Sequence, residues 1–291
     1  MKIFKYFFEF ISVVSFFSIF KIIGLKNASN LGGVIGRLFG PLFRSQEIIK
    51  KNIKIALGEI SKKELDIIID GMWSNIGRTF AEYMFLKNFK FNTVKFKHIE
   101  IKGIEHLSEI KKNNQSVIFY AGHFANFELM AMEIDKFGIK CAAIYRPLNN
   151  IFLNPLMEYL RMKYICPNQI PKGRMGMREI IQKVKNGYSV ALMVDQRVGE
   201  APREIFFNKP AHTTTIPAQL ALKYDCKLVP ISLERKEDVK FLMTVHEPQK
   251  MNKTGDSKLD TKNITLKINQ TLEQMVIKNP TQWIWSHNRW K

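Results

Sequence analysis

Cysteine is scarce in this chain. Only three cysteines, Cys141, Cys166 and Cys226, occur among 291 residues, and no two of them form a C-x-x-C pair. A disulfide framework or a cysteine zinc site needs more thiols at closer spacing. The low count therefore excludes a disulfide-stabilised secreted scaffold and is typical of a domain that faces a reducing compartment.

Acidic residues are also few. Asp and Glu together number 26 against 45 Lys and Arg, so the formal net charge is +19. A charge of this size favours a polyanionic partner: nucleic acid, an anionic membrane surface, or an acidic protein or substrate. Because 46% of the residues are hydrophobic, the chain can bury a sizeable core, and a disordered or fibrous protein is excluded.

Several catalytic motifs are missing as well. The sequence has no GxSxG, no GxxxxGK[ST], no GxGxxG and no HExxH. The sequence therefore lacks the motifs that several enzyme classes need for catalysis or cofactor binding: serine hydrolases of the nucleophile-elbow type, P-loop NTPases, dinucleotide enzymes and zincins. The histidines other than His123 are scattered without metal-ligand spacing, so we expect no metal and no cofactor.

The longest apolar stretch stands at the N-terminus. Residues 1–24 read MKIFKYFFEFISVVSFFSIFKIIG, and the uncharged run from Phe10 to Phe20 has about half the length of a simple membrane span. A convincing signal-peptide cleavage site is missing. We interpret residues 1–24 as an uncleaved membrane anchor that either spans the bilayer or lies in its interface; the alternative is a buried core helix.

Basic residues follow the anchor. Six lysines and arginines stand between residues 25 and 54 against the single acid Glu47. Positive residues beside an apolar segment stay in the cytoplasm and bind anionic headgroups. We therefore expect a basic juxtamembrane segment at 25–60 and a catalytic domain at 61–291 on the cytoplasmic face of the membrane.

The rest of the chain alternates between helical and strand-like patterns. Ser61 and Glu64 form a capping-box pattern that begins a helix reaching Phe89, and strand-like alternation begins at Val94. Polar residues at 251–262 predict a surface loop. Continuous apolar runs have the composition of buried strands, at residues 116–122, 140–147, 189–197 and 227–235. Helical candidates lie at 126–137, 152–164, 176–186 and 215–224.

This alternation predicts an α/β fold with a mainly parallel central sheet flanked by helices. In such sheets ligands bind at the carboxyl ends of the strands. These ends carry charged and polar side chains, which we expect on one edge: His123, Arg146, Asp195, Gln196, Arg197 and Arg235.

One short stretch, AGHFANFEL, carries a candidate catalytic pair. Gly122 permits a tight turn and Asn126 is a plausible helix N-cap, so Glu128 falls in the first helical turn, where it can meet the imidazole of His123. A carboxylate that orients an imidazole makes a general base for a hydroxyl. The alternative is that Glu128 only caps a helix and His123 is an ordinary loop residue.

The stretch belongs to a longer series of blocks. GHFANFEL resembles the GHFGNWEL block of the lipid A biosynthesis lauroyl and myristoyl acyltransferases, which belong to the His-x4-Asp/Glu acyltransferases. Further blocks resemble the same family in order, namely YRPLNNIFLNPLMEYLR, GYSVALMVDQR, FFNKPAHTTTIPAQLALKYDCKLVPISLER and PTQWIWSHNRWK. The chain departs from the pattern at Ala125 and Asn208, which replace glycines, and at Phe127 and Asn288.

The resemblance implies a glycerolipid-acyltransferase-like fold and transfer of a fatty acyl chain from acyl carrier protein to a hydroxyl of a lipid A precursor. His123 would be the general base and Glu128 would orient it, without metal or cofactor. Further residues would bind substrate: Arg146, Arg161 and Arg197 with phosphate or phosphopantetheine, and Asp195 and Gln196 from the third block. The alternative for Asp195 is a pair with a structural arginine.

Parts of the sequence are also compatible with other functions. A glycerol-phosphate or lysophospholipid acyltransferase shares the first block, but its third block is closer to EGTRS than to MVDQRVGE. A nucleic-acid-binding protein would interleave basic residues with exposed aromatics, whereas the aromatics here gather in the anchor and in buried-looking strands, so we expect no nucleic acid. A membrane-binding protein without catalysis would be expected to lack His123 or Glu128. The expected partners are acyl carrier protein, the lipid A precursor and anionic inner-membrane lipids.

Overall fold

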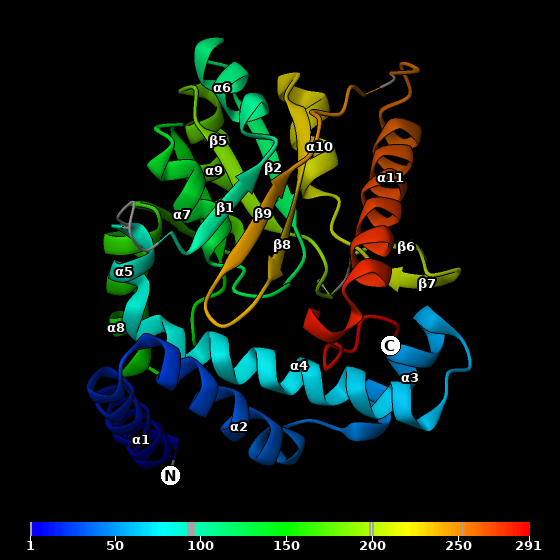
Figure 1. Ribbon diagram of the computed structural model, residues 1–291. Helices are drawn as coiled ribbons and strands as arrows, with labels where there is room; N and C mark the ends of the chain where they lie inside the picture. The colour runs from blue at the N-terminus through cyan, green and yellow to red at the C-terminus, as the bar shows by residue number, and fades with distance from the viewer. Residues whose placement is uncertain (1, 92–96, 198, 200, 252) are drawn as a thin grey trace.

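A seven-stranded sheet forms the centre of the molecule (Figure 1). The computed structural model describes residues 2–91, 97–197, 199, 201–251 and 253–291. The strands are β1 (Ile99–Lys102), β2 (Val117–Ala121), β3 (Cys141–Tyr145), β4 (Asn168–Pro171), β5 (Ser189–Met193), β8 (Lys227–Arg235) and β9 (Phe241–Val245). The strand-like alternation expected from Val94 begins, among these residues, with β1; residues 94–96 lie outside them.

The sheet order is β1-β9-β8-β2-β5-β3-β4, and every neighbouring pair is parallel except β8 with β9. The prediction of a mainly parallel sheet is therefore confirmed. The four apolar runs found in the sequence contribute β2, β3, β5 and β8, which run in one direction.

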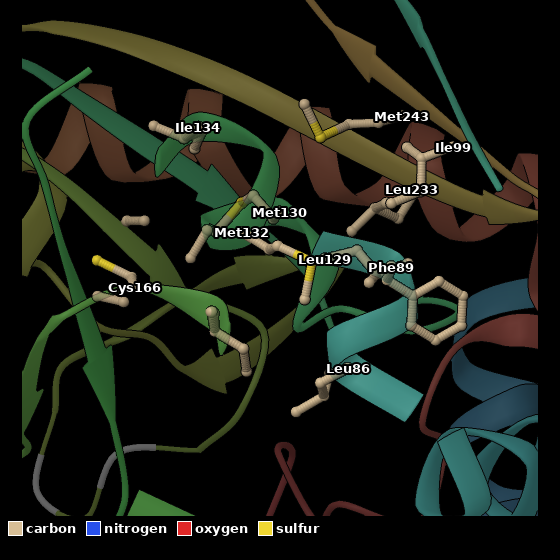
Figure 2. Packing of buried hydrophobic residues seen from close by; sticks show 14 of the residues in the cluster. Leu86, Phe89, Ile99, Leu129, Met130, Met132, Ile134, Cys166, Leu233 and Met243 are labelled. Atoms are coloured by element: carbon tan, nitrogen blue, oxygen red, sulfur yellow. The ribbon is translucent and has the colours of Figure 1, made fainter. Parts of the chain in front are cut away.

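Both faces of the sheet are covered, as continuous apolar strands require. Along β2, Val117 and Phe119 belong to one buried cluster, and Ile118 and Tyr120 to the other. Figure 2 shows part of the first cluster, where side chains of α5 (Leu86–Lys90) and α7 (Leu129–Lys136) meet Leu233 and Met243. The second cluster includes side chains of α9 (Arg174–Lys185), α10 (Ile216–Tyr224) and α11 (Ser257–Lys278).

Among the described residues, five α-helices precede the first strand: α1 (Lys2–Ile23), α2 (Leu25–Phe43), α3 (Gln46–Leu57), α4 (Lys62–Glu82) and the short α5. The predicted capping box begins α4, since Ser61 and Glu64 bond reciprocally. The helix expected to reach Phe89 is interrupted by a 3₁₀ turn (Tyr83–Phe85) and resumes as α5. In Figure 1, α4 crosses below the sheet, and α1 and α2 lie beyond it.

Small residues let α2 pack closely on α4. A Cβ atom added to Gly36 would lie 2.2 Å from the carbonyl oxygen of Trp73, and one added to Gly77 would lie 2.0 Å from that of Gly32. Only glycine fits such a crossing without moving the backbones. Within the described residues, α1 is the one helix long and apolar enough to cross a membrane.

The remaining described elements lie between the sheet strands or follow α11. They are α6 (Ile104–Lys112), α8 (Leu153–Leu160), a π-helical turn (Arg161–Ile165), the hairpin β6 (Arg203–Phe206) and β7 (Lys209–His212), and a 3₁₀ turn (Pro280–Gln282). The three cysteines are buried and unbridged. The polar segment 251–262 was expected to be a loop, but α11 begins inside it because Asp256 accepts hydrogen bonds from the backbone N–H groups of Lys258 and Leu259.

Candidate active site

The carboxyl ends of neighbouring parallel strands form the candidate site. β2, β5 and β3 lie side by side and run the same way, so residues just beyond their ends share one edge. His123 follows β2, Asp195 follows β5 and Arg146 follows β3. The edge predicted from the sequence is thus present in the structure.

The imidazole of His123 is held by Asp195. Its Nδ1 lies 2.7 Å from Asp195 Oδ1, and the second carboxylate oxygen accepts the backbone N–H of His123 at 2.8 Å. That oxygen also accepts the indole N–H of Trp283 at 2.8 Å. Asp195 therefore fixes both the backbone and the ring of His123.

Asp195 is ionised under ordinary conditions. Its side chain is only 2% exposed, and burial opposes ionisation, but the charge and hydrogen bonds of His123 together with the Trp283 bond lower the pKa of Asp195 to about 2. An ionised carboxylate on Nδ1 makes this nitrogen the donor of the neutral ring. The lone pair of Nε2 then remains to accept a proton.

Glu128 is engaged elsewhere, which corrects the expected contact with His123. One carboxylate oxygen of Glu128 accepts hydrogen bonds from Nε of Arg161 at 3.1 Å and from Nη2 at 2.7 Å, and it also bonds to the hydroxyl of Tyr83. The physical reason is strand order. Asp195 emerges from β5, directly beside β2, and occupies Nδ1, while the chain after His123 turns Glu128 toward the π-helical turn that carries Arg161.

Gly122 and Ala125 shape the loop that carries His123. Gly122 does not adopt a left-handed conformation; instead, an added Cβ would lie 2.6 Å from the ring of Phe124 and 3.3 Å from Asp195 Oδ2. The left-handed residue is Ala125, with φ 48°. Ala125 stands where the resembling family pattern has glycine, and this conformation explains why glycine suits the position.

Asn126 supports the loop, but not as the expected N-cap. Helix α7 begins at Leu129, with Glu128 at the N-cap position and no side-chain cap. The amide of Asn126 instead donates to Glu82 Oε2 at 2.9 Å. Glu82 is fully buried and pairs with Arg235 at the end of β8, so α4, β8 and the His123 loop are joined by one polar network.

His123 lines a cavity of about 250 Å³, here called the catalytic cavity. Glu128, Arg161 and the expected substrate-binding residues Arg146, Gln196 and Arg197 line it as well. Arg161 Nη1 is buried and has no hydrogen-bond partner among the described residues. The cavity therefore combines a base, an incompletely paired guanidinium and apolar walls.

His287 supports the segment after β5. Its Nδ1 accepts the backbone N–H of Arg197 at 3.0 Å. Burial lowers the pKa of His287 to about 4, with Arg44 and Arg289 among the charges acting in the same direction, so the ring is neutral and can accept.

Four of these residues were not identified from the sequence: Glu82, Tyr83, Trp283 and His287. Trp283 and His287 lie in the closing block PTQWIWSHNRWK, which was a usable signal. Glu82 and Tyr83 lie at the end of an amphipathic helix without a motif. Among the described residues no group of three or more His, Cys, Asp or Glu side chains gathers as a metal site requires.

Comparison with known proteins points to one family. The family described as bacterial lipid A biosynthesis acyltransferase matches residues 1–291. Lipid A biosynthesis acyltransferase 2 of Shigella flexneri is 27% identical over 262 residues, which cover 88% of this chain and 80% of that protein. The lauroyltransferase of Escherichia coli K12 is 24% identical over 255 residues, covering 85% of this chain and 79% of that protein.

The comparison with solved structures gave a more distant likeness. The 1-acyl-sn-glycerophosphate acyltransferase of Thermotoga maritima superposes with a TM-score of 0.39 at 16% identity, covering 87% of this chain and 98% of that one.

Proposed function

Because the chain belongs to the bacterial lipid A biosynthesis acyltransferases, we propose that it transfers a fatty acyl chain from acyl carrier protein to a hydroxyl of a lipid A precursor. The family match makes it an acyltransferase of lipid A biosynthesis rather than a nucleic-acid-binding protein. We propose the acyl donor, the acceptor hydroxyl and the roles of individual residues beyond this family membership.

The bond between His123 Nδ1 and Asp195 carries the proposal. With Asp195 on Nδ1, Nε2 of His123 takes the proton of the acceptor hydroxyl as its oxygen attacks the thioester carbonyl. The C–O bond forms, the C–S bond breaks, and the protonated imidazole returns its proton to the departing thiolate. The reaction needs no covalent enzyme intermediate.

Arg161 supports the transition state in this scheme. Attack on the thioester places negative charge on the carbonyl oxygen, and a positioned donor in a water-poor cavity stabilises such charge. The buried, unpartnered Nη1 of Arg161 is available for this task. Glu128 and Tyr83 would then act by holding Arg161 in place.

The surroundings of the site support a membrane location and an acidic donor. Helix α1 exposes large apolar side chains such as Phe4 and Ile22, as a lipid anchor on the inner membrane would. The net charge of +19 suits anionic inner-leaflet lipids on the cytoplasmic face, and acyl carrier protein, which is acidic.

The test is an acyl-transfer assay with labelled acyl–acyl carrier protein and purified lipid A precursor. We expect His123→Ala and Asp195→Asn each to lower the rate by about a thousandfold while the protein still folds, because the base or its orientation is lost. If Asp195→Asn kept the wild-type rate while Glu128→Gln lost as much as His123→Ala, Glu128 would be the orienting carboxylate and this assignment would be wrong.

A further inference from the structure

A second cavity of about 1040 Å³ adjoins the catalytic cavity. The two cavities share Arg146, Gln196 and Arg197 in their walls, while His123 lines only the smaller one. The larger cavity reaches from this junction to the N-terminal helices. Its lining has two parts that differ in chemistry.

One part of the lining is cationic. Arg44, Arg146 and Arg197 line it, and no aspartate or glutamate lies among the residues that form its walls. None of the three arginines forms an ion pair with another described residue. Arg197 Nε is buried and has no hydrogen-bond partner among the described residues. A buried donor without a partner costs free energy, which an anion bound between these groups would recover.

Another part of the lining is apolar and belongs to the N-terminal helices. Phe16 and Phe20 come from α1, Phe39 and Phe43 from α2, and Phe80 from α4. This wall continues into exposed apolar side chains of α2, because Phe43 is 76% exposed and the neighbouring Leu42 is 78% exposed. The cavity therefore suits a molecule that joins an anionic head to hydrocarbon chains.

We propose that the larger cavity binds the acyl acceptor as a phosphorylated amphiphile, with a phosphate among Arg44, Arg146 and Arg197 and hydrocarbon chains along α1, α2 and α4. The inference rests on the proposed acyl transfer and assigns its acceptor a place. The acceptor hydroxyl then reaches His123 past the side chains that line both cavities, Arg146, Gln196 and Arg197. The donor's acyl chain occupies the catalytic cavity. The phosphate of the donor's phosphopantetheine is the competing source of the same chemistry.

The experiment measures equilibrium binding of lipid A precursor, with and without its phosphates, to the full chain in detergent micelles. We expect Arg44→Gln to raise the Kd of the phosphorylated acceptor about tenfold and to leave the Kd of the dephosphorylated acceptor unchanged, because one charge-assisted contact is lost. Arg44 is exposed at the end of α2, so the variant should fold.

Arg37→Gln is the matched control. Arg37 lies on the same helix, does not line the cavity, and contacts Asp70 at 3.7 Å on its surface. It should bind both acceptors as the wild type does. Equal weakening of both acceptors by Arg44→Gln, or no weakening, would overturn the proposal.

Two companion readouts separate the possible sources of failure. In the transfer assay, a higher KM for the acyl carrier protein thioester in Arg44→Gln, with unchanged acceptor binding, would assign the phosphate to phosphopantetheine and contradict the proposal. Binding does not depend on turnover. A wild-type chain that discriminates between the two acceptors without transferring an acyl group would therefore refute the proposed function and leave the acceptor site standing.

Discussion

At the residue scale, the site pairs each of its two carboxylates with a different nitrogen-bearing side chain. Asp195 holds the imidazole of His123, and Glu128 holds the guanidinium of Arg161. The sequence predicted that both acids lie at the site, because both follow the ends of apolar runs. It could not assign their partners, since the partner of His123 depends on β5 lying beside β2, and that order is a long-range property of the sheet.

His287 should make the free energy of unfolding depend on pH. The pKa of His287 is lowered from the usual value near 6.5 to about 4, so the unfolded chain binds a proton in a range where the folded chain does not. The contribution of the neutral His287 ring to the free energy of unfolding is complete above about pH 6.5 and is lost as the pH falls from there toward 4.

We expect the wild type to lose about 2 kcal/mol more unfolding free energy between pH 7 and pH 4 than His287→Asn, a value reduced from the full linkage because the ring is partly exposed. Asn keeps an acceptor for the backbone N–H of Arg197 and does not titrate. Denaturant unfolding at a series of pH values is the measurement. Parallel curves for the two proteins would show that His287 is not the responsible group.

At the element scale, continuous apolar runs predicted strands correctly, whereas polar composition did not predict a loop correctly. The runs predicted β2, β3, β5 and β8 because a strand covered on both faces must be apolar throughout. Two of the other strands lie outside these four runs. The edge strand β4 reads NQIP and is not a continuous apolar run, and β9 is the antiparallel neighbour of β8. Helix α11 begins within a polar segment, because a single capping aspartate outweighs composition.

The hairpin of β6 and β7 gives a second test at this scale. Its two connecting residues, Phe207 and Asn208, both have positive φ, 50° and 56°, as a type I′ turn requires. Asn208 replaces a glycine of the resembling family pattern, and Asn tolerates this conformation better than other side chains do.

Asn208→Ala should therefore lower the free energy of unfolding by about 1 kcal/mol and the Tm by roughly 2 °C, whereas Asn208→Gly should change either quantity little. The side chain is exposed, so lost packing does not confuse the comparison. Thermal unfolding followed by circular dichroism is sufficient. Equal effects of the Ala and Gly replacements would argue against a left-handed turn residue.

At the scale of the whole molecule, the sheet edge that carries His123 and Asp195 faces the N-terminal helices. Figure 1 shows α4 crossing below the sheet, with α1 and α2 beyond it. Arg235, at the end of β8, reaches Glu82 of α4, which also accepts a hydrogen bond from Ser29 of α2. The sequence suggested an anchor at 1–24 and a separate basic segment at 25–60, and this division stays a prediction, although α2 packs directly on α4.

The polar network around Glu82 was beyond reach of the sequence. Its members Ser29, Glu82, Asn126 and Arg235 are far apart along the chain, and no local pattern relates them. Their convergence joins the His123 loop, α2 and α4 at the carboxyl ends of the strands. Under the proposed function, this arrangement would let the enzyme take its acceptor from a membrane and its donor from solution.

Acyl transfer to lipid A is tested most directly by mass spectrometry of lipid A from cells lacking this gene. We expect lipid A lighter by the mass of one acyl chain, restored by the wild-type gene and not by His123→Ala expressed at the same level. Unchanged lipid A in the deletion strain, or full restoration by His123→Ala, would contradict it.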